Sequence, residues 1–180
     1  KEEFELNWVE ASAHPIGAVG LWNSMIKIIK MAKEKGDDII VICEDDHYFT
    51  ENYSPKLLFK EVTEAYIQGA EVLSGGIGGF GQAIPAGYHR YKVDWFWCTQ
   101  FIVIYNRFFD KMLDYSFQNT DTADGVISKL ATNIMVIYPF ISEQKDFGYS
   151  DVTQSNMEQQ GKIREHFARA NKHMKSISLK

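Results

Sequence analysis

Three consecutive carboxylates, Glu44, Asp45 and Asp46, follow directly on an apolar run that spans residues 39–43. The run is rich in branched aliphatic residues and follows a Gly-Asp-Asp turn, which predicts a strand buried on both faces of a sheet. Adjacent carboxylates repel one another, and burial raises their pKa values unless a cation neutralises them. A hard divalent cation is the natural neutraliser, and open sheets bind ligands at the carboxyl ends of their strands. These residues predict a metal site at the mouth of a nucleotide-binding sheet; a solvated acidic turn is the simpler alternative.

Asp124 is a second candidate for chemistry. It lies one turn into a helix predicted over residues 120–132, beyond the position at which Asp121 can cap that helix. If Asp124 faces the same crevice, its carboxylate could act as a general base. Trp95 and Trp97 alternate with polar and apolar neighbours in a strand-like run. Indole rings beside an acidic site suit stacking on a sugar face, whereas tryptophans in strands more often pack in the core.

Several other patterns carry less chemistry. The glycine-rich stretch 74–81 lacks the Lys-Ser/Thr pair of a phosphate-binding loop, so it predicts a loop after a strand that could cover or admit a substrate. His47 adjoins the carboxylates and is either a ligand or exposed, and His166 is a candidate ligand from a distant segment. No Cys/His spacing indicates structural zinc, and no nucleophile-elbow motif supports a hydrolase triad.

The remaining periodicity predicts how these residues are positioned. Strands are expected at residues 4–10, 39–43, 70–74, 91–98, 100–105 and 134–138, and helices at 16–35, 54–69, 106–115 and 120–132. Alternating strands and helices are typical of an α/β fold with a mainly parallel sheet flanked by helices.

Composition sets the outer limits. The chain has 180 residues, of which 45% are hydrophobic, as expected for one globular domain. A net charge of −5 argues against nucleic acid as a partner, although the basic segment 162–180 could make peripheral contact with a membrane. Cys43 and Cys98 lie in apolar runs and are expected to be reduced core residues. The chain shows no signal peptide or membrane-spanning run, so we expect a soluble, cytoplasmic protein, and its start at Lys1 leaves room for missing upstream residues.

Four stretches, taken in order, resemble the motifs of GT-A-type glycosyltransferases, and most of all those of glycosyltransferase family 25, the lipooligosaccharide or lipopolysaccharide enzymes. They are the Gly-x-x-Gly-x-x-x-Ser helix start at 17–24, the apolar-Glu-Asp-Asp variant of the DxD motif at 41–46, the strand-then-helix segment 99–113, and Asp124 followed by 138–144 and 149–152. The family usually has His after the Ser of the first motif, where this chain has Met25.

The resemblance covers roughly residues 4–153 and implies a GT-A-like (Rossmann-like) domain over residues 1–155. The polar residues beyond it predict a helical tail over 156–180. The resemblance implies a hexosyltransferase that moves a sugar from a nucleotide-sugar, commonly a UDP-sugar, to a cell-surface glycan acceptor in lipopolysaccharide biosynthesis, with Mn²⁺ or Mg²⁺ as cofactor. The cation would stabilise the nucleoside diphosphate leaving group.

The resemblance also assigns roles to individual residues. Asp46, together with Glu44, would hold the metal, and Glu44 or Asp45 would contact the ribose or a metal-bound water. Ser24 would belong to the cofactor-binding site, and Asp124 would deprotonate the acceptor hydroxyl.

One departure from the family concerns the nucleotide pocket. Family members begin with a strand and an arginine that help to form the nucleotide pocket, and nothing similar precedes Phe4. Either the chain is a fragment lacking the first strand, or the uridine side is built differently, or binding is lost. This departure keeps open a non-catalytic GT-A-like binding domain. A nucleotidyl- or phosphoryl-transferring enzyme is a further alternative, because such enzymes also place carboxylates and a metal at a strand end.

Overall fold

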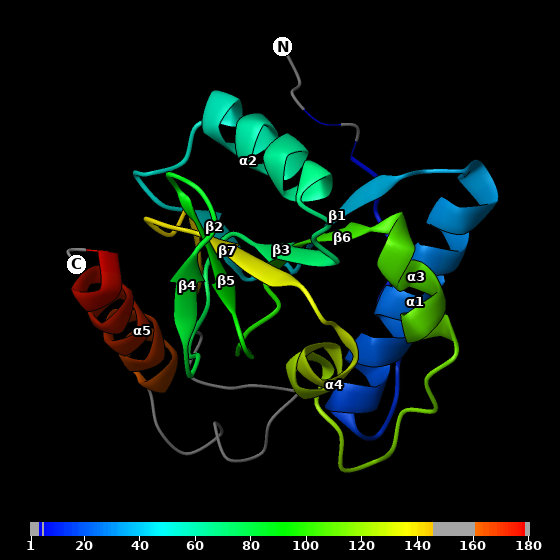
Figure 1. The fold of residues 1–180 in the computed structure, drawn as a ribbon. Coiled ribbons are helices and arrows are strands. Elements are labelled where there is room, and N and C mark those ends of the chain that lie inside the picture. The colour runs from blue at the N-terminus through cyan, green and yellow to red at the C-terminus, as the bar shows by residue number, and fades with distance from the viewer. Residues whose placement is uncertain (1–3, 5, 146–160, 179–180) are drawn as a thin grey trace.

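The computed structural model describes residues 4, 6–145 and 161–178, which form a mixed α/β fold with a sheet flanked by helices (Figure 1). The helices are α1 (Gly17–Lys35), α2 (Pro55–Ile67), α3 (Asn106–Leu113), α4 (Ala123–Leu130) and α5 (Lys162–Ser178). The strands are β1 (Ile39–Cys43), β2 (His47–Phe49), β3 (Val72–Ser74), β4 (Ala83–Pro85), β5 (Arg90–Val93), β6 (Phe101–Tyr105), β7 (Ile134–Ile137) and β8 (Ser142–Gln144).

Local capping signals place the ends of the first two helices as predicted. Gly36 follows α1 in the left-handed conformation, with φ of 74°, and its amide donates to the carbonyl of Lys33. Ser54 caps α2 by accepting a hydrogen bond from the Leu57 amide, and Pro55 occupies the first helical position.

The sheet is not mainly parallel, and this expectation was wrong. Its six strands lie in the order β1-β6-β3-β7-β5-β4, and β3–β7 is the one parallel pair among the described strands of this sheet. Strand β6 runs antiparallel between β1 and β3. The physical reason is that β4 and β5 form an antiparallel pair and β6 is entered through the loop 94–100, so neither β5 nor β6 follows a helical crossover.

Strand β1 lies at the sheet edge and pairs only with β6 among the described strands. Val41 is 37% exposed and Cys43 is exposed, so the predictions of a strand buried on both faces and of a core Cys43 were wrong. An edge position explains this, because one side of β1 has no neighbouring strand to cover it. Residues 6–10 form no strand.

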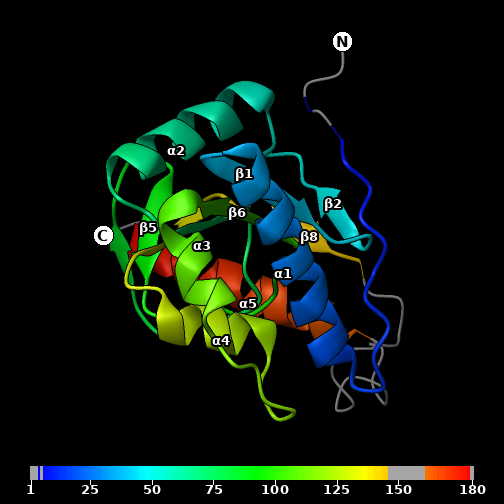
Figure 2. The same cartoon turned by 90° about the vertical axis from the view of Figure 1, so that its right-hand side faces the viewer.

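Two hydrophobic clusters cover the two faces of the sheet. Along β6, Ile102 and Ile104 enter one cluster while Val103 and Tyr105 enter the other, as alternation along a strand requires. Helix α2 covers one face, and α1, α3, α4 and α5 cover the other (Figures 1 and 2). Helix α5 lies within the predicted helical tail, but it is not merely polar, since it buries Phe167, Ala170 and Met174. The expected boundary at residue 155 lies outside the described residues.

The topology brings the ends of several strands together at one end of the sheet. Strands β1, β3 and β7 point in the same direction, so their carboxyl ends meet the start of the oppositely directed β6. The residues at this end of the sheet come from segments far apart in the sequence, and they include the predicted acidic residues. A two-stranded ribbon of β2 and β8, which the sequence did not predict, continues from the same end.

Candidate active site at the end of strand β1

The three carboxylates leave β1 through a tight turn, which we call the acidic corner (Glu44, Asp45 and Asp46). The His47 amide donates to the Glu44 carbonyl at 3.2 Å, and the Glu44 amide donates to the Gln100 carbonyl at 3.0 Å. The Lys145 amide donates to the Asp46 carbonyl at 2.8 Å, which ties the corner to β8. The backbone of the acidic corner is therefore held from both sides.

Glu44 is half-buried and points toward the loop that precedes β6. Its Oε1 accepts a hydrogen bond of 2.5 Å from the hydroxyl of Thr99, which is itself buried. Burial raises the pKa of Glu44 to about 7, the Thr99 hydrogen bond opposes this rise, and the nearby charges of Asp46, Asp124 and Asp45 add to it. Glu44 is thus a carboxylate whose ionised form lacks sufficient positive charge around it.

Asp46 carries an unsatisfied oxygen. Its Oδ2 accepts 2.6 Å from the Gln144 amide, but its Oδ1 is buried with no hydrogen-bond partner. Burial raises the pKa of this carboxyl, and the Gln144 hydrogen bond opposes the rise. Buried polar atoms normally have a partner, so an orphaned carboxylate oxygen is the kind of ligand that a hard cation would satisfy. Asp45, by contrast, is exposed.

The protein alone does not form a complete metal cage. In the parts of the chain that the structure describes, no group of three or more His, Cys, Asp or Glu side chains is arranged to hold an ion. Glu44 and Asp46 fit the other common arrangement, in which one or two carboxylates hold Mg²⁺ or a similar cation and water and substrate phosphates complete its shell.

The structure brings Asp124 to this site. Thr122 caps α4 through the Gly125 amide, so Asp124 lies in the first turn with its Oδ2 accepting 3.1 Å from the Cys98 amide. Its negative charge contributes to the raised pKa of Glu44, so the two carboxylates lie close enough to interact electrostatically. Asp121, which was expected to cap this helix, instead accepts from the Tyr115 hydroxyl at 3.0 Å.

Cys98 and Thr99 are site residues that sequence reasoning missed. Cys98 has a positive φ of 77°, in the left-handed region that a non-glycine residue occupies only at a cost of about 1–2 kcal/mol. This conformation directs its amide to Asp124 and lets the next residue reach Glu44. Burial, followed by the charges of Asp124 and Glu44, raises the pKa of the Cys98 thiol. No local pattern signals this conformation, because Cys has no preference for it.

The other predicted residues make different contacts. Ser24 donates to the Gly20 carbonyl and accepts from the Ser12 amide, both at 2.9 Å, and within the described residues no contact joins it to Glu44. Its cofactor-binding role stays a prediction. His47 bonds Ser142 through Nδ1 at 2.8 Å, and burial lowers its pKa.

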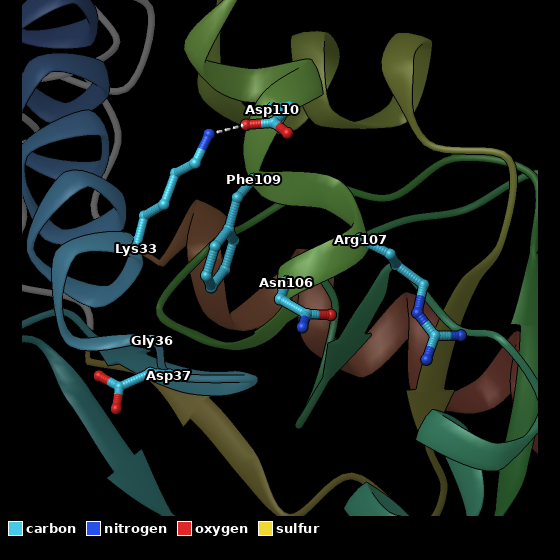
Figure 3. Close-up of a pocket in the computed structure, with 7 residues that line it drawn as sticks. All are labelled: Lys33, Gly36, Asp37, Asn106, Arg107, Phe109 and Asp110. Carbon is cyan, nitrogen blue, oxygen red and sulfur yellow. Dashed lines mark hydrogen bonds and ion pairs between the residues drawn. The ribbon is translucent and has the colours of Figure 1, made fainter.

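Two surface cavities, each of about 380 Å³, have linings that include none of Glu44, Asp45, Asp46 and Asp124. One is lined by Lys33, Gly36, Asp37, Asn106, Arg107, Phe109 and Asp110 (Figure 3). It lies where β1 begins and β6 ends, at the opposite end of β1 from the acidic corner, and an ion pair between Lys33 and Asp110 crosses it. The other is lined by Tyr48, Phe49, Thr50, Glu51, Asn52, Phe140, Glu143 and Asn171.

Comparisons with known proteins assign no family. No family model and no curated protein matches the chain. Among solved structures, apo UDP-glucose pyrophosphorylase is similar with a TM-score of 0.47 and 10% sequence identity, over 86% of this chain and 61% of that chain. None of the helices in the described ranges is long and apolar enough to cross a membrane. The function is therefore inferred from the residues of the chain itself.

Proposed function

We propose that the chain is a metal-dependent glycosyltransferase domain that transfers a hexose from a nucleotide-sugar, in the first instance a UDP-sugar, to a glycan acceptor. The observation that supports it best is the pairing of Glu44 with Asp46, whose buried Oδ1 has no partner, at the carboxyl end of β1. Asp124, which lies in α4, supplies a third carboxylate whose charge acts on Glu44 and which need not bind the metal.

Each residue has a distinct role in this proposal. Glu44 and Asp46 would hold Mn²⁺ or Mg²⁺, and the exposed Asp45 would contact the ribose. A cation bound there would offset the negative charge that develops on the departing nucleoside diphosphate. Asp124 would accept the proton of the acceptor hydroxyl, since a carboxylate retains lone pairs beyond those used by the Cys98 and Gly125 amides.

The resemblance to family 25 extends the proposal to the biological setting. It supports a cell-surface glycan of the lipopolysaccharide type as acceptor and a cytoplasmic site of action. Helix α5 carries exposed basic side chains at Arg164, Arg169, Lys172 and Lys175. Their charge supports peripheral contact with an anionic membrane as part of the same proposal.

Calorimetry with UDP tests the metal and nucleotide parts of the proposal. We expect wild-type protein to bind UDP in the presence of Mn²⁺ and much more weakly without it. Asp46→Asn should abolish the metal-dependent part of UDP binding. Asp37→Asn should not, because Asp37 is exposed and lies at the opposite end of β1.

Three outcomes would contradict the proposal in different ways. No UDP signal with Mn²⁺ would favour a non-catalytic binding domain. Turnover of a nucleoside triphosphate with release of pyrophosphate or phosphate would favour a nucleotidyl- or phosphoryl-transferring enzyme. Equal binding by wild type and Asp46→Asn would remove the acidic corner from the site altogether.

A further inference from the structure

Two tryptophans of the loop that carries Cys98 and Thr99 form, with a histidine of α5, a partly exposed aromatic surface, which we call the aromatic platform (Trp95, Trp97 and His166). The rings of Trp95 and Trp97 lie 5.1 Å apart between centroids with planes tilted by 48°. The His166 ring, from α5, lies 5.7 Å from that of Trp97. Trp97 remains 47% exposed. The prediction left open whether these tryptophans were core residues, and the structure keeps a large part of the Trp97 indole in contact with solvent.

The loop that carries the platform is held in place by hydrogen bonds at almost every residue. Asp94 Oδ1 accepts from three backbone amides at 2.9–3.1 Å, those of Gly81, Gln82 and Trp95. The Phe96 amide donates to Ser128 Oγ at 3.2 Å. The Cys98 amide donates to Asp124, as described above. The exposed Trp97 indole and the partly exposed Trp95 indole are therefore carried by a loop that many hydrogen bonds hold in place, so little ordering entropy would be lost on binding.

The glycine-rich segment explains how the Trp97 ring is seated. The Trp97 amide and carbonyl bond Gly79 and Gly78 at 3.1 Å and 2.9 Å, so the segment lies directly under the ring. A Cβ placed on Gly79 would come within 2.7 Å of the indole. Gly79 thus works as a flat support for an aromatic ring, a role that differs from phosphate binding.

Hydrogen bonds join the platform loop to two of the site carboxylates. The Cys98 amide, next to Trp97, donates to Asp124, and the Thr99 hydroxyl donates to Glu44. Asp46 bonds Gln144 instead. The platform is therefore next in the chain to the residue that holds the proposed base.

We propose that the aromatic platform binds a pyranose ring of the acceptor glycan by stacking, with an acceptor hydroxyl directed to Asp124. This rests on the proposed function and adds the element that recognises the acceptor. The apolar C–H face of a pyranose matches an exposed indole, and its edge hydroxyls match carboxylate acceptors such as Asp94 and Asp124. Asp94 lies in the platform loop and Asp124 accepts from the Cys98 amide, so carboxylates that can accept sugar hydroxyls adjoin Trp97, whereas the charges of Arg169 and Lys162 act on the His166 side.

Saturation-transfer NMR on the whole chain, with neither metal nor nucleotide present, tests the platform. The probes are the methyl glycosides of galactose, glucose and mannose, and lactose, each at millimolar concentration. We expect at least one to bind wild-type protein with its signal on the protons of one ring face. Trp97→Ala should weaken this binding roughly tenfold, and Trp97→Phe should keep part of it. Trp8→Ala, which removes an indole that is 88% exposed outside this loop, is the matched control and should have no effect.

Separate measurements keep this proposal distinct from the proposed function. Trp97→Ala should bind UDP with Mn²⁺ as wild type does, and Asp46→Asn should bind the glycosides as wild type does. Absence of binding by all four probes, or equal loss in Trp8→Ala, would overturn the platform even if UDP binds. Weaker UDP binding by Trp97→Ala would assign the rings to the donor. Trp97-dependent binding of tetramethylammonium that is tighter than binding of the glycosides would assign the rings to a cation. Either result overturns the platform proposal. Failure of UDP to bind, with glycoside binding intact, would overturn only the transferase proposal.

Discussion

Replacing Glu44 by glutamine should stabilise the metal-free protein above neutral pH and have little effect in acid. The reason is that burial and neighbouring carboxylates raise the pKa of Glu44 from 4.5 to about 7. Between these two pH values the folded protein binds more protons than the unfolded chain. Glu44 therefore does not reduce the free energy of unfolding below about pH 4.5, and it reduces this free energy progressively as the pH rises toward 7. Glutamine removes the titration while keeping an oxygen that can accept from Thr99.

The size of the effect follows from the difference of the two pKa values. The pKa rises from 4.5 to about 7, a difference of about 2.5, and each pKa unit corresponds to about 1.4 kcal/mol, which sets an upper limit of about 3.5 kcal/mol. Glu44 keeps some contact with solvent, so screening lowers the expected gain at pH 8 to about 1–3 kcal/mol. For a chain of this length that corresponds to an increase in Tm of roughly 3–10 °C.

Thermal unfolding from pH 4 to pH 9 in the presence of a chelator measures this effect. The difference in Tm between Glu44→Gln and wild type should grow through the window from about 4.5 to 7 and then level off. Added Mn²⁺ should raise the Tm of wild type more than that of the variant, because a bound cation stabilises the ionised carboxylate. Asp37→Asn is the control, since Asp37 is exposed. Parallel pH profiles for wild type and Glu44→Gln, or a variant less stable at pH 8, would refute the assignment of Glu44 as a buried carboxylate that lacks a counter-charge.

Two further predictions concern stability. Cys98→Val should lower the free energy of unfolding by about 2 kcal/mol or more, because a β-branched residue resists a φ of 77°. Cys98→Gly should stay within about 1 kcal/mol of wild type, because glycine adopts this φ readily. Equal losses for the two variants in urea titrations would show that packing, and not backbone strain, dominates at this position. Glu61→Ala should lower it by about 3–5 kcal/mol, because the fully buried guanidinium of Arg90 loses its closest ion pair. Glu64→Ala, whose side chain is 42% exposed, should cost less than about 1 kcal/mol, and similar values for the two variants would contradict the importance of burial.

Local signals were enough to predict the helices and part of the site. Gly36 ended α1 and Ser54 began α2 as predicted, because capping depends on residues within one turn of the helix end. The run 39–43 formed β1, so the carboxylates 44–46 lie at its carboxyl end, and these are also properties of neighbouring residues.

Weak or ambiguous signals led to the errors in the strands. Residues 91–98 read as one strand, but β5 ends at Val93, and the rest is the loop held by Asp94, Ser128 and Asp124. The short strands β2, β4 and β8 have three residues each, too few for alternation to show.

The amino-acid sequence by itself determined the end of α1, the start of α2 and that three carboxylates follow an apolar strand, whereas α4 begins at Ala123, three residues later than predicted. Only the tertiary structure decided that β6 runs antiparallel beside β1, that β1 lies at an edge, and that Thr99 bonds Glu44 while the charge of Asp124 acts on it. The physical reason is that strand direction and these contacts join residues far apart in the chain, whereas capping and strand propensity act between neighbours. The left-handed Cys98 belongs with the long-range group, because its conformation accompanies hydrogen bonds that the fold brings to it from α4.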